Sequence, residues 1–219
     1  MDKAVTHKAH RQDESFFGDL AYRMTAPFRG LIKRYAPTFL KQMSWESEFK
    51  RGRHLHTLSA DYRSRICDSI ESHCRNGDVL DLGCSDGHIG FGLNLSKYAS
   101  YTGVDISETA VREAGEKTRS IAPARTTKNT FVCADIGKYT PATSFDLILF
   151  KDSLYYFTAR ELPLVLEHYR AFLKPGGLFL VEMDDIERHR WISIFIRQHY
   201  AVLEDREDPQ RDLALLVFR

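Results

Sequence analysis

From Asp78 onward the sequence alternates short apolar runs with stretches of helical periodicity, and this alternation constrains the fold more than any other feature. Apolar runs that are separated by helices predict parallel strands joined by crossovers. Five strands are expected, at residues 78–82, 100–105, 130–134, 145–150 and 178–183. Helices are expected between them, at residues 89–97, 108–119 and 159–173. The sequence LKPGG (173–177) is expected to stop the last helix before the fifth strand.

The pattern changes after the fifth strand. Residues 190–200 have apolar residues at helical spacing, and they are followed by two apolar segments, AVLED and LALLVFR. The short turn-rich segment REDPQRD separates these two segments, so they are expected to pair as antiparallel neighbours. An α/β sheet that closes on a hairpin differs from the topology of the dehydrogenases.

Residues 1–76 are predicted to be helical, with helices within residues 16–24, 28–43 and 59–77. Ala60–Cys74 is the best defined, because Tyr62, Ile66 and Ile70 share one stripe and Gly77 follows its end. We therefore expect two parts, a helical substrate cover over residues 1–76 and a compact core over residues 77–219.

The composition excludes several classes of protein. A net charge of +1 implies no polyanionic partner, and no window approaches the roughly 18 apolar residues of a membrane span. The N-terminus lacks the apolar centre of a signal peptide. The four cysteines show no Cys-x-x-Cys spacing, which favours reduced thiols in a cytoplasmic protein and no zinc site.

Acidic residues lie at the ends of three successive strands. Asp81 precedes the glycine-containing turn Gly83–Gly87, Asp105 closes the second strand, and Asp135 follows the third. An acid about 20 residues beyond such a turn is placed to accept the hydroxyls of a ribose. Asp135 is placed either to accept an adenine amine or to cap a turn. Because the turn contains no lysine or arginine for a phosphate, the pattern indicates a nucleoside site without a phosphate receptor.

In this order and spacing the motifs resemble those of the class I S-adenosylmethionine-dependent methyltransferases. The resemblance covers residues 78–219 and rests on DLGCSDG, GVDIS, CADI, FDLILFKDSLYYF and LKPGGLFLVE. It implies a Rossmann-like α/β fold: a mostly parallel seven-stranded sheet with helices on both faces, a C-terminal antiparallel hairpin and a helical N-terminal lid. Ser85 departs from the family's G-x-G-x-G form, where a glycine is common, and this departure is compatible with a slightly displaced methionine part of the donor.

The resemblance implies S-adenosyl-L-methionine as the cofactor, with S-adenosyl-L-homocysteine as its product. Gly83, Cys84 and Ser85 would line the methionine part, and Asp105 would hold the ribose. Other residues would frame the adenine (Asp135, Ile136), flank the sulfonium (Lys151, Asp152) or complete the donor site (Asp81, Ile106, Trp45, Arg63). Trp45 is equally compatible with core packing, and Arg63 and Arg65 with a solvated helix face.

A second resemblance links residues 45–58 to the N-terminal lid of small-molecule methyltransferases, including the nodulation-type enzymes that act on an amino sugar. The same group often has paired aromatic residues after the fourth strand, as Tyr155 and Tyr156 are here. The candidate catalytic residues are Asp152, Tyr156 and His56, and His54 is a further possible base. Two histidines alone do not make a closed metal site, so no metal is expected.

We therefore expect methyl transfer to an oxygen or nitrogen atom of a small polar molecule, such as a sugar or a glycosidic natural-product intermediate. The alternatives are a protein or RNA methyltransferase and a protein that binds the donor without catalysis. The near-neutral charge argues against RNA, and KDSLYY stands where an N-P-P-Y-type motif would be needed for bases. No nucleic acid or membrane partner is expected, and the expected assembly is a monomer or a homodimer.

Overall fold

The computed structural model describes residues 28–51 and 60–219. The predicted helix at residues 16–24 lies outside this range. The described elements, in chain order, are α2 (Arg29–Tyr35), α3 (Thr38–Lys50), α4 (Ala60–Cys74), β1 (Asp78–Leu82), α5 (His88–Gly92), β2 (Ser100–Asp105), α6 (Glu108–Ile121), η3 (Pro123–Arg125), β3 (Asn129–Cys133), β4 (Phe145–Lys151), η4 (Leu154–Tyr156), α7 (Leu162–Arg170), β5 (Leu173–Asp184), α8 (Ile186–His199), β6 (Val202–Asp208) and β7 (Leu213–Phe218).

The chain divides into two compact units, Met1–Ser44 and Trp45–Arg219. In this division α4 belongs to the same unit as the sheet. The role of residues 1–76 as a substrate cover stays a prediction. None of the helices within the described ranges is both long enough and apolar enough to cross a membrane.

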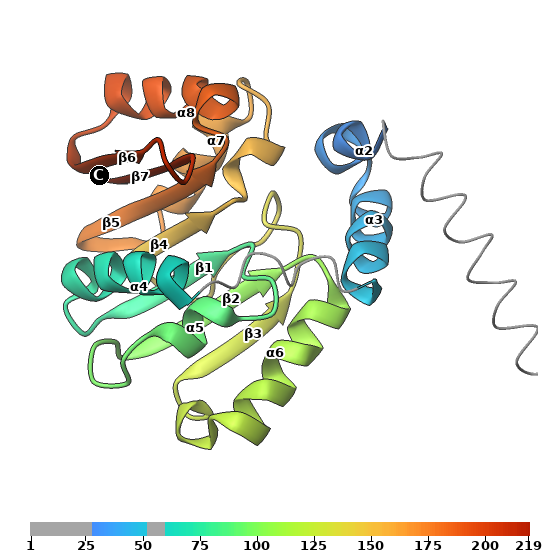
Figure 1. The fold of residues 1–219 in the computed structure, drawn as a ribbon, viewed down its shortest axis with the longest axis vertical. Helices are drawn as coiled ribbons and strands as arrows, with labels where there is room; N and C mark the ends of the chain where they lie inside the picture. Colours follow the sequence, from blue (N-terminus) through green and yellow to red (C-terminus); the bar gives the residue numbers. More distant parts are fainter. Residues whose placement is uncertain (1–27, 52–59) are drawn as a thin grey trace, which may run out of the picture. The chain divides into compact units, whose positions relative to one another are not determined.

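Seven strands form one mixed sheet in the order β3-β2-β1-β4-β5-β7-β6 (Figure 1). β1 pairs in parallel with both β2 and β4, and β5 pairs with β7 antiparallel. The chain runs outward from β1 to β3 and then crosses back to β4, so the strand order reverses between β1 and β4. The predicted Rossmann-like sheet with a C-terminal hairpin is confirmed.

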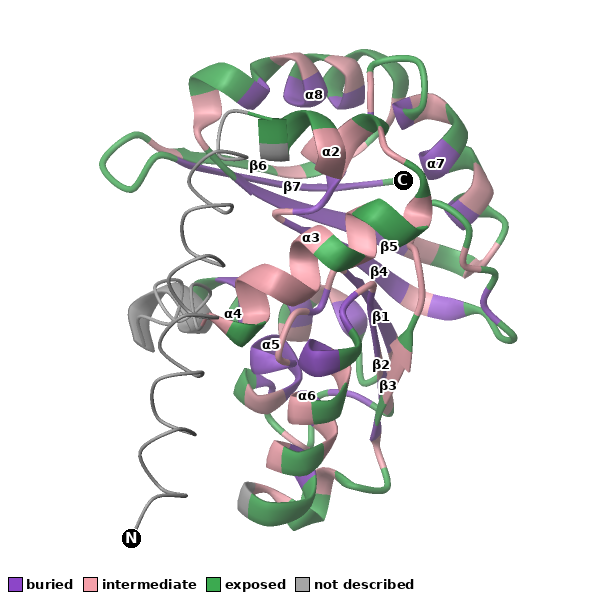
Figure 2. Ribbon diagram, turned by 90° about the vertical axis from the view of Figure 1, so that its right-hand side faces the viewer, coloured by how far each residue is buried: buried purple, intermediate pink, exposed green. Residues whose placement is uncertain are grey.

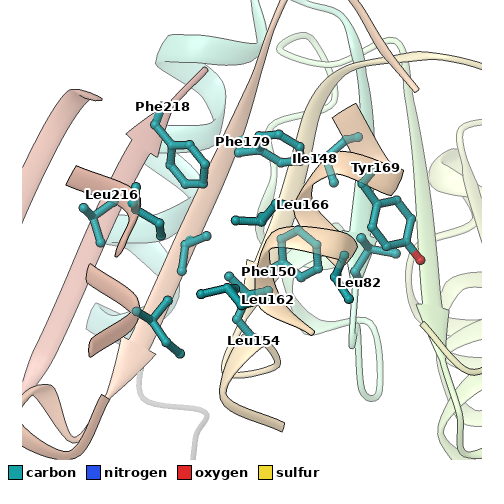
Figure 3. Packing of buried hydrophobic residues seen from close by; sticks show 14 of the residues in the cluster. Leu82, Ile148, Phe150, Leu154, Leu162, Leu166, Tyr169, Phe179, Leu216 and Phe218 are labelled. Atoms are coloured by element: carbon teal, nitrogen blue, oxygen red, sulfur yellow. The ribbon is translucent and has the colours of Figure 1, made fainter. Parts of the chain in front are cut away.

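Helices cover both faces of this sheet, and each face has its own apolar core. On one face, α7 and α8 pack against the central strands, and Figure 3 shows Leu166 of α7 beside Phe150 and Phe179. On the other face, Ile66 and Ile70 of α4 pack with residues of α5 and the same strands. Burial is concentrated along the strands, while the outward surfaces of α6 and α8 are exposed (Figure 2). The two cores hold the carboxyl ends of the parallel strands in a fixed arrangement.

Three predicted elements occur with the predicted bounds: the strands Asp78–Leu82 and Ser100–Asp105 and the helix Ala60–Cys74. β3 begins and ends one residue earlier than predicted. β6 extends to Asp208, so the first part of REDPQRD is strand rather than turn.

Two predicted helices are shorter in the structure. α5 ends at Gly92, and the side chain of Asn94 then accepts hydrogen bonds from Ser96, which forms a turn instead of another helical turn. α7 begins only at Leu162, with a proline in its first turn, and ends at Arg170.

The predicted role of LKPGG as a helix stop is wrong. These residues form the first part of β5, because the carbonyl of Phe172 already accepts a hydrogen bond from the N–H of Phe145 at 2.8 Å. Gly177 packs closely against the start of β4, since a Cβ at this position would lie 3.0 Å from the carbonyl oxygen of Phe145. The proline and glycines therefore shape the start of a strand.

Candidate active site

The predicted donor site lies where the parallel strands end. β1, β2, β4 and β5 run in the same direction, so their carboxyl ends meet along one edge of the sheet. Ligands of open α/β sheets bind outside these ends, at the point where the strand order reverses. The loops after β1, β2 and β4 therefore carry the residues to compare with the predicted site.

The loop after β1 brings its backbone close to the loop after β4. Gly83 has a φ of +93°, and a Cβ at this position would lie 2.8 Å from the Cβ of Ser153. Ser85 has a φ of +54°, in the left-handed region that favours glycine. The departure from G-x-G-x-G therefore places a serine in a conformation that glycine would adopt without strain.

Asp105, at the end of β2, holds two backbone segments together. One carboxylate oxygen accepts the N–H of Ser85 and the other accepts the N–H of Ser107, both at 2.9 Å. Burial raises the pKa of Asp105 to about 6, although these hydrogen bonds oppose the shift. At neutral pH the group is mostly ionised, so it can accept hydroxyl groups of a ligand. Ile106 continues the same loop.

Asp81 lies beneath the glycine loop and is fully buried. The hydroxyl of Tyr101 donates a hydrogen bond to its Oδ2, while Oδ1 has no hydrogen-bond partner among the described residues. Burial raises the pKa of Asp81 to about 6. Cys84 is also buried, and burial raises the pKa of its thiol well above the usual value. The thiol is therefore protonated at neutral pH.

Asp135 follows β3 and closes a turn. Its Oδ1 accepts the N–H of Gly137 at 2.9 Å, which is the turn-capping geometry considered above for this residue. The carbonyl of Ile136 accepts a hydrogen bond from the hydroxyl of Tyr169, which ties this loop to α7. The assignment of Asp135 and Ile136 to an adenine stays a prediction.

The end of β4 is joined to the end of β5. Lys151 is buried and forms an ion pair with Asp152, whose backbone adopts a positive φ of 50°. The Oδ1 atom of Asp152 accepts the N–H of Asp184 at 3.0 Å. The predicted sulfonium-flanking residues are therefore held in a network that spans two strands.

Aromatic rings line the segment that follows. Tyr156 meets Trp45 edge to face, with 5.1 Å between the ring centroids, and the Tyr155 and Tyr156 centroids are 4.8 Å apart. Tyr155 in turn stacks on His189 of α8 at 4.1 Å. The structure thus brings together Trp45, predicted as a donor-site residue, and Tyr156, predicted as a catalytic residue. It also places His189 beside them, a residue that the sequence analysis did not identify.

Glu46 is a second residue that the sequence did not identify. Its Oε1 accepts hydrogen bonds from the hydroxyl of Ser107 at 3.1 Å and from the N–H of Thr109 at 3.0 Å. Burial by itself would raise the pKa of Glu46. The hydrogen bonds from Thr109 and Ser107 outweigh burial, so the net pKa of Glu46 lies below its usual value. An ionised carboxylate therefore sits at the start of α6, beside Asp105. In the sequence, only the position of Glu46 next to Trp45 pointed to a role at this site.

Other predicted residues lie elsewhere or outside the described ranges. His54 and His56 fall in residues 52–59, and the side chain of Arg63 is not described. Arg65 forms an ion pair with Asp208 at 2.6 Å, so it is engaged at the end of β6. Within residues 28–51 and 60–219, no three histidine, cysteine or acidic side chains form a group that could hold a metal ion.

Comparisons with known proteins agree with the observed fold. Residues 80–179 match a family model described as a methyltransferase domain. The human protein named arginine-hydroxylase NDUFAF5, mitochondrial, is 30% identical over 146 residues, which cover 65% of this chain and 39% of that protein. A Drosophila pseudoobscura pseudoobscura protein named eEF1A lysine and N-terminal methyltransferase homolog is 26% identical over 184 residues, which cover 79% of this chain and 27% of that protein. The chain thus spans less than half the length of these curated relatives.

A solved structure has the same fold. N-methyltransferase NodS from Bradyrhizobium japonicum WM9, in complex with S-adenosyl-L-homocysteine, superposes with a TM-score of 0.56 at 20% sequence identity. The match covers 78% of this chain and 87% of that one. At this identity the likeness establishes the fold.

Proposed function

We propose that this chain, which its methyltransferase domain and its fold identify as a class I S-adenosylmethionine-dependent methyltransferase, methylates an oxygen or nitrogen atom of a small polar acceptor. One observation carries the choice of a small acceptor. β5 ends at Asp184 and α8 begins at Ile186, so a single residue separates them and no inserted substrate domain stands beside the donor site at this point. A sugar or glycosidic intermediate is the acceptor class that we propose.

Three features of the chain fit S-adenosylmethionine as the cofactor. Gly83 lets the loop after β1 pack against Ser153 in the loop after β4, Asp105 offers a carboxylate to two hydroxyl groups, and the buried Oδ1 of Asp81 is an acceptor without a partner among the described residues. Leaving such a group unsatisfied costs roughly 1–3 kcal/mol, which an ammonium group would recover. When bound, the cofactor supplies an electrophilic methyl group on a sulfonium.

The chain's own residues would hold the donor and orient the acceptor. Gly83, Cys84 and Ser85 are proposed to line the methionine part, and Asp105 with Ile106 the ribose side. The remaining proposed donor contacts are Asp135, Ile136, Lys151, Asp152, Trp45 and Arg63. Holding nucleophile and methyl group in line supplies most of the acceleration in such a displacement.

The predicted catalytic residues differ in what they can do. Burial raises the pKa of Tyr156 well above its usual range, so its hydroxyl stays protonated at neutral pH and is suited to donate a hydrogen bond. Asp152 already accepts from Asp184 and is paired with Lys151. We therefore propose that Tyr156 and Asp152 position the acceptor. His56 stays a candidate base.

A protein acceptor is the alternative. It is favoured by the name of the insect relative, which denotes an eEF1A lysine and N-terminal methyltransferase homolog, and by the name of the human relative, which denotes an arginine hydroxylase. A third candidate is a protein that binds the donor without catalysis. The cytoplasmic location is also a proposal, since the human relative is named as mitochondrial. That the protein is a monomer or a homodimer is likewise a proposal.

Incubation with S-adenosylmethionine that carries a radiolabelled methyl group tests these alternatives. The extract of the source organism would be separated into low-molecular-mass, protein and RNA fractions, and the Asp105→Ala variant would serve as the control with weakened donor binding. Label in the low-molecular-mass fraction supports the proposal. Label in protein or RNA alone contradicts it, and donor binding without any transfer favours the non-catalytic alternative.

A further inference from the structure

We propose that His189 is the group that takes the proton from the acceptor during methyl transfer, an inference that rests on the proposed function. Neither the sequence motifs nor the comparisons point to this residue. It lies in the first turn of α8, immediately after the end of β5, and it is 8% exposed.

Two contacts place His189 beside the predicted transfer site. Its ring stacks on Tyr155, with 4.1 Å between centroids and 7° between planes. Tyr155 neighbours Tyr156, which contacts Trp45. The residue also sits five positions after Asp184, whose N–H is bonded to Asp152 at the end of β4. The imidazole is therefore held between the end of β5 and the aromatic segment that follows β4.

The hydrogen bond of His189 fixes which nitrogen carries the proton. Nδ1 lies 2.8 Å from the carbonyl oxygen of Asp184. A carbonyl oxygen only accepts hydrogen bonds, so Nδ1 must be the donor. In the neutral ring the lone pair is then on Nε2, for which no hydrogen bond is found among the described residues. A tautomer set by a backbone carbonyl is the usual way in which a histidine is prepared to accept a proton.

The titratable and charged groups on the neighbouring elements are Asp184 on β5, Asp185 at the start of α8, Lys151 and Asp152 on β4, and Tyr155 on η4. Burial, and then Asp152, raises the pKa of Asp184, while His189 and Lys151 oppose the shift. The elements around His189 therefore carry three carboxyl groups and one lysine.

The proton transfer balances within the proposed reaction. The O–H or N–H bond of the acceptor breaks and its proton forms a bond with Nε2. A lone pair of the acceptor oxygen or nitrogen forms the bond to the methyl carbon, as the bond from that carbon to sulfur breaks and its pair stays on sulfur. The pair of the broken O–H or N–H bond stays on the acceptor atom. The products are the methylated acceptor, S-adenosylhomocysteine and a His189 imidazolium, which then returns its proton to solvent.

The first test replaces the ring by groups that keep one of its contacts. In His189→Asn the side-chain amide can still donate to the carbonyl of Asp184, and in His189→Phe the stack on Tyr155 can be kept. His199→Asn is the matched control, because His199 lies on the same helix with its Nδ1 2.9 Å from the carbonyl of Phe195. The probe is the low-molecular-mass extract fraction that accepts label from the wild-type protein.

We expect both His189 variants to lose at least 100-fold in kcat, with S-adenosylhomocysteine affinity by calorimetry within twofold of wild type. His199→Asn should keep the wild-type kcat. A His189 variant that binds S-adenosylhomocysteine and keeps its kcat would overturn the inference while the proposed function stands. If the wild-type protein labels no small molecule, the proposed function fails and the inference falls with it.

The second test needs no acceptor. The full chain is labelled with 15N-histidine, and the His189 ring signals are identified by their absence from the His189→Asn spectrum. Long-range 15N–1H correlation under alkaline conditions should show the proton on Nδ1. A proton on Nε2 would overturn the inference whatever the activity measurements give.

Discussion

The Asp105 carboxylate accepts the backbone N–H of Ser85 at 2.9 Å, so the end of β2 is tied directly to the glycine-containing loop that follows β1. The other carboxylate oxygen is bonded to the N–H of Ser107 at the start of α6. One side chain thus joins two of the loops that carry the proposed donor-binding residues. It also carries the negative charge that a ribose would meet there.

Replacement of Asp105 by alanine should weaken S-adenosylmethionine binding by about 10–100-fold, since hydrogen bonds to a charged group contribute roughly 1.5–3 kcal/mol. Calorimetric titration measures the change. Asp68→Asn, at an exposed position of α4, is the control and should bind like wild type. Equal affinities for Asp105→Ala and wild type would remove Asp105 from the donor site.

Donor binding should depend on pH in the range where Asp81 and Asp105 titrate. Both have a pKa raised to about 6 by burial, so both gain protons as the pH falls through this value. Ionised carboxylates are the better acceptors for hydroxyl and ammonium groups. We expect the affinity for S-adenosylhomocysteine to fall about tenfold or more between pH 7 and pH 5. An affinity that is flat across this range would contradict the expectation.

The same raised pKa values have an opposite consequence for stability. An unfolded aspartate has a pKa near 3.9, so between about pH 4 and pH 6 the folded protein binds more protons than the unfolded chain. The contribution of Asp81 and Asp105 to the free energy of unfolding therefore decreases as the pH rises through this window. Denaturant unfolding of wild type and Asp81→Asn at pH 4.5 and pH 7 measures it, and the pH-dependent loss should be smaller in the variant.

Ser85 provides a test of the loop backbone. Its φ of +54° costs a non-glycine residue roughly 1–2 kcal/mol, and the greater freedom of glycine in the unfolded chain offsets part of any gain. Ser85→Gly should therefore be as stable as wild type or up to about 1 kcal/mol more stable. Ser85→Val should lose at least about 1 kcal/mol, because β-branched residues tolerate this region poorly. Urea unfolding measures both, and a fully stable valine variant would contradict the assigned conformation.

The proximity of Asp81 and Asp105 could be predicted from the sequence because of a simple geometric rule. Parallel strands end at one edge of their sheet, so Asp81 and Asp105 had to lie near each other once their strands were identified. The burial of Asp81 could not be predicted, since it depends on the hydroxyl of Tyr101 reaching across from the neighbouring strand. The left-handed backbone of Ser85 was signalled only by the resemblance, in which a glycine is common at this position, because serine itself gives no signal for it.

Contacts between residues far apart in the chain were also beyond the sequence. Glu46 reaches Ser107, 61 residues away, and His189 stacks on Tyr155 across two elements. Neither pair has a characteristic spacing, because both arise from the packing of complete helices. The error at LKPGG has a similar cause, since a proline and two glycines suit a strand start and a helix end equally well, and the pairing of β5 with β4 decided between them.

Glu46 offers the last test, because its charge acts on Asp105. It is one of the groups that raise the pKa of Asp105, after burial, and its own pKa is lowered, so it stays ionised wherever Asp105 titrates. Glu46→Gln keeps the shape and an oxygen that can accept from Thr109, but it removes the charge. The pKa of Asp105 should then fall, and the pH below which donor affinity declines should move to a lower value. Calorimetry from pH 5 to pH 8 measures this shift, with Glu116→Gln on the exposed face of α6 as the control. A wild-type profile in Glu46→Gln would show that the two carboxylates do not interact, whereas a lower midpoint would establish that α3 tunes the donor site through this single charge.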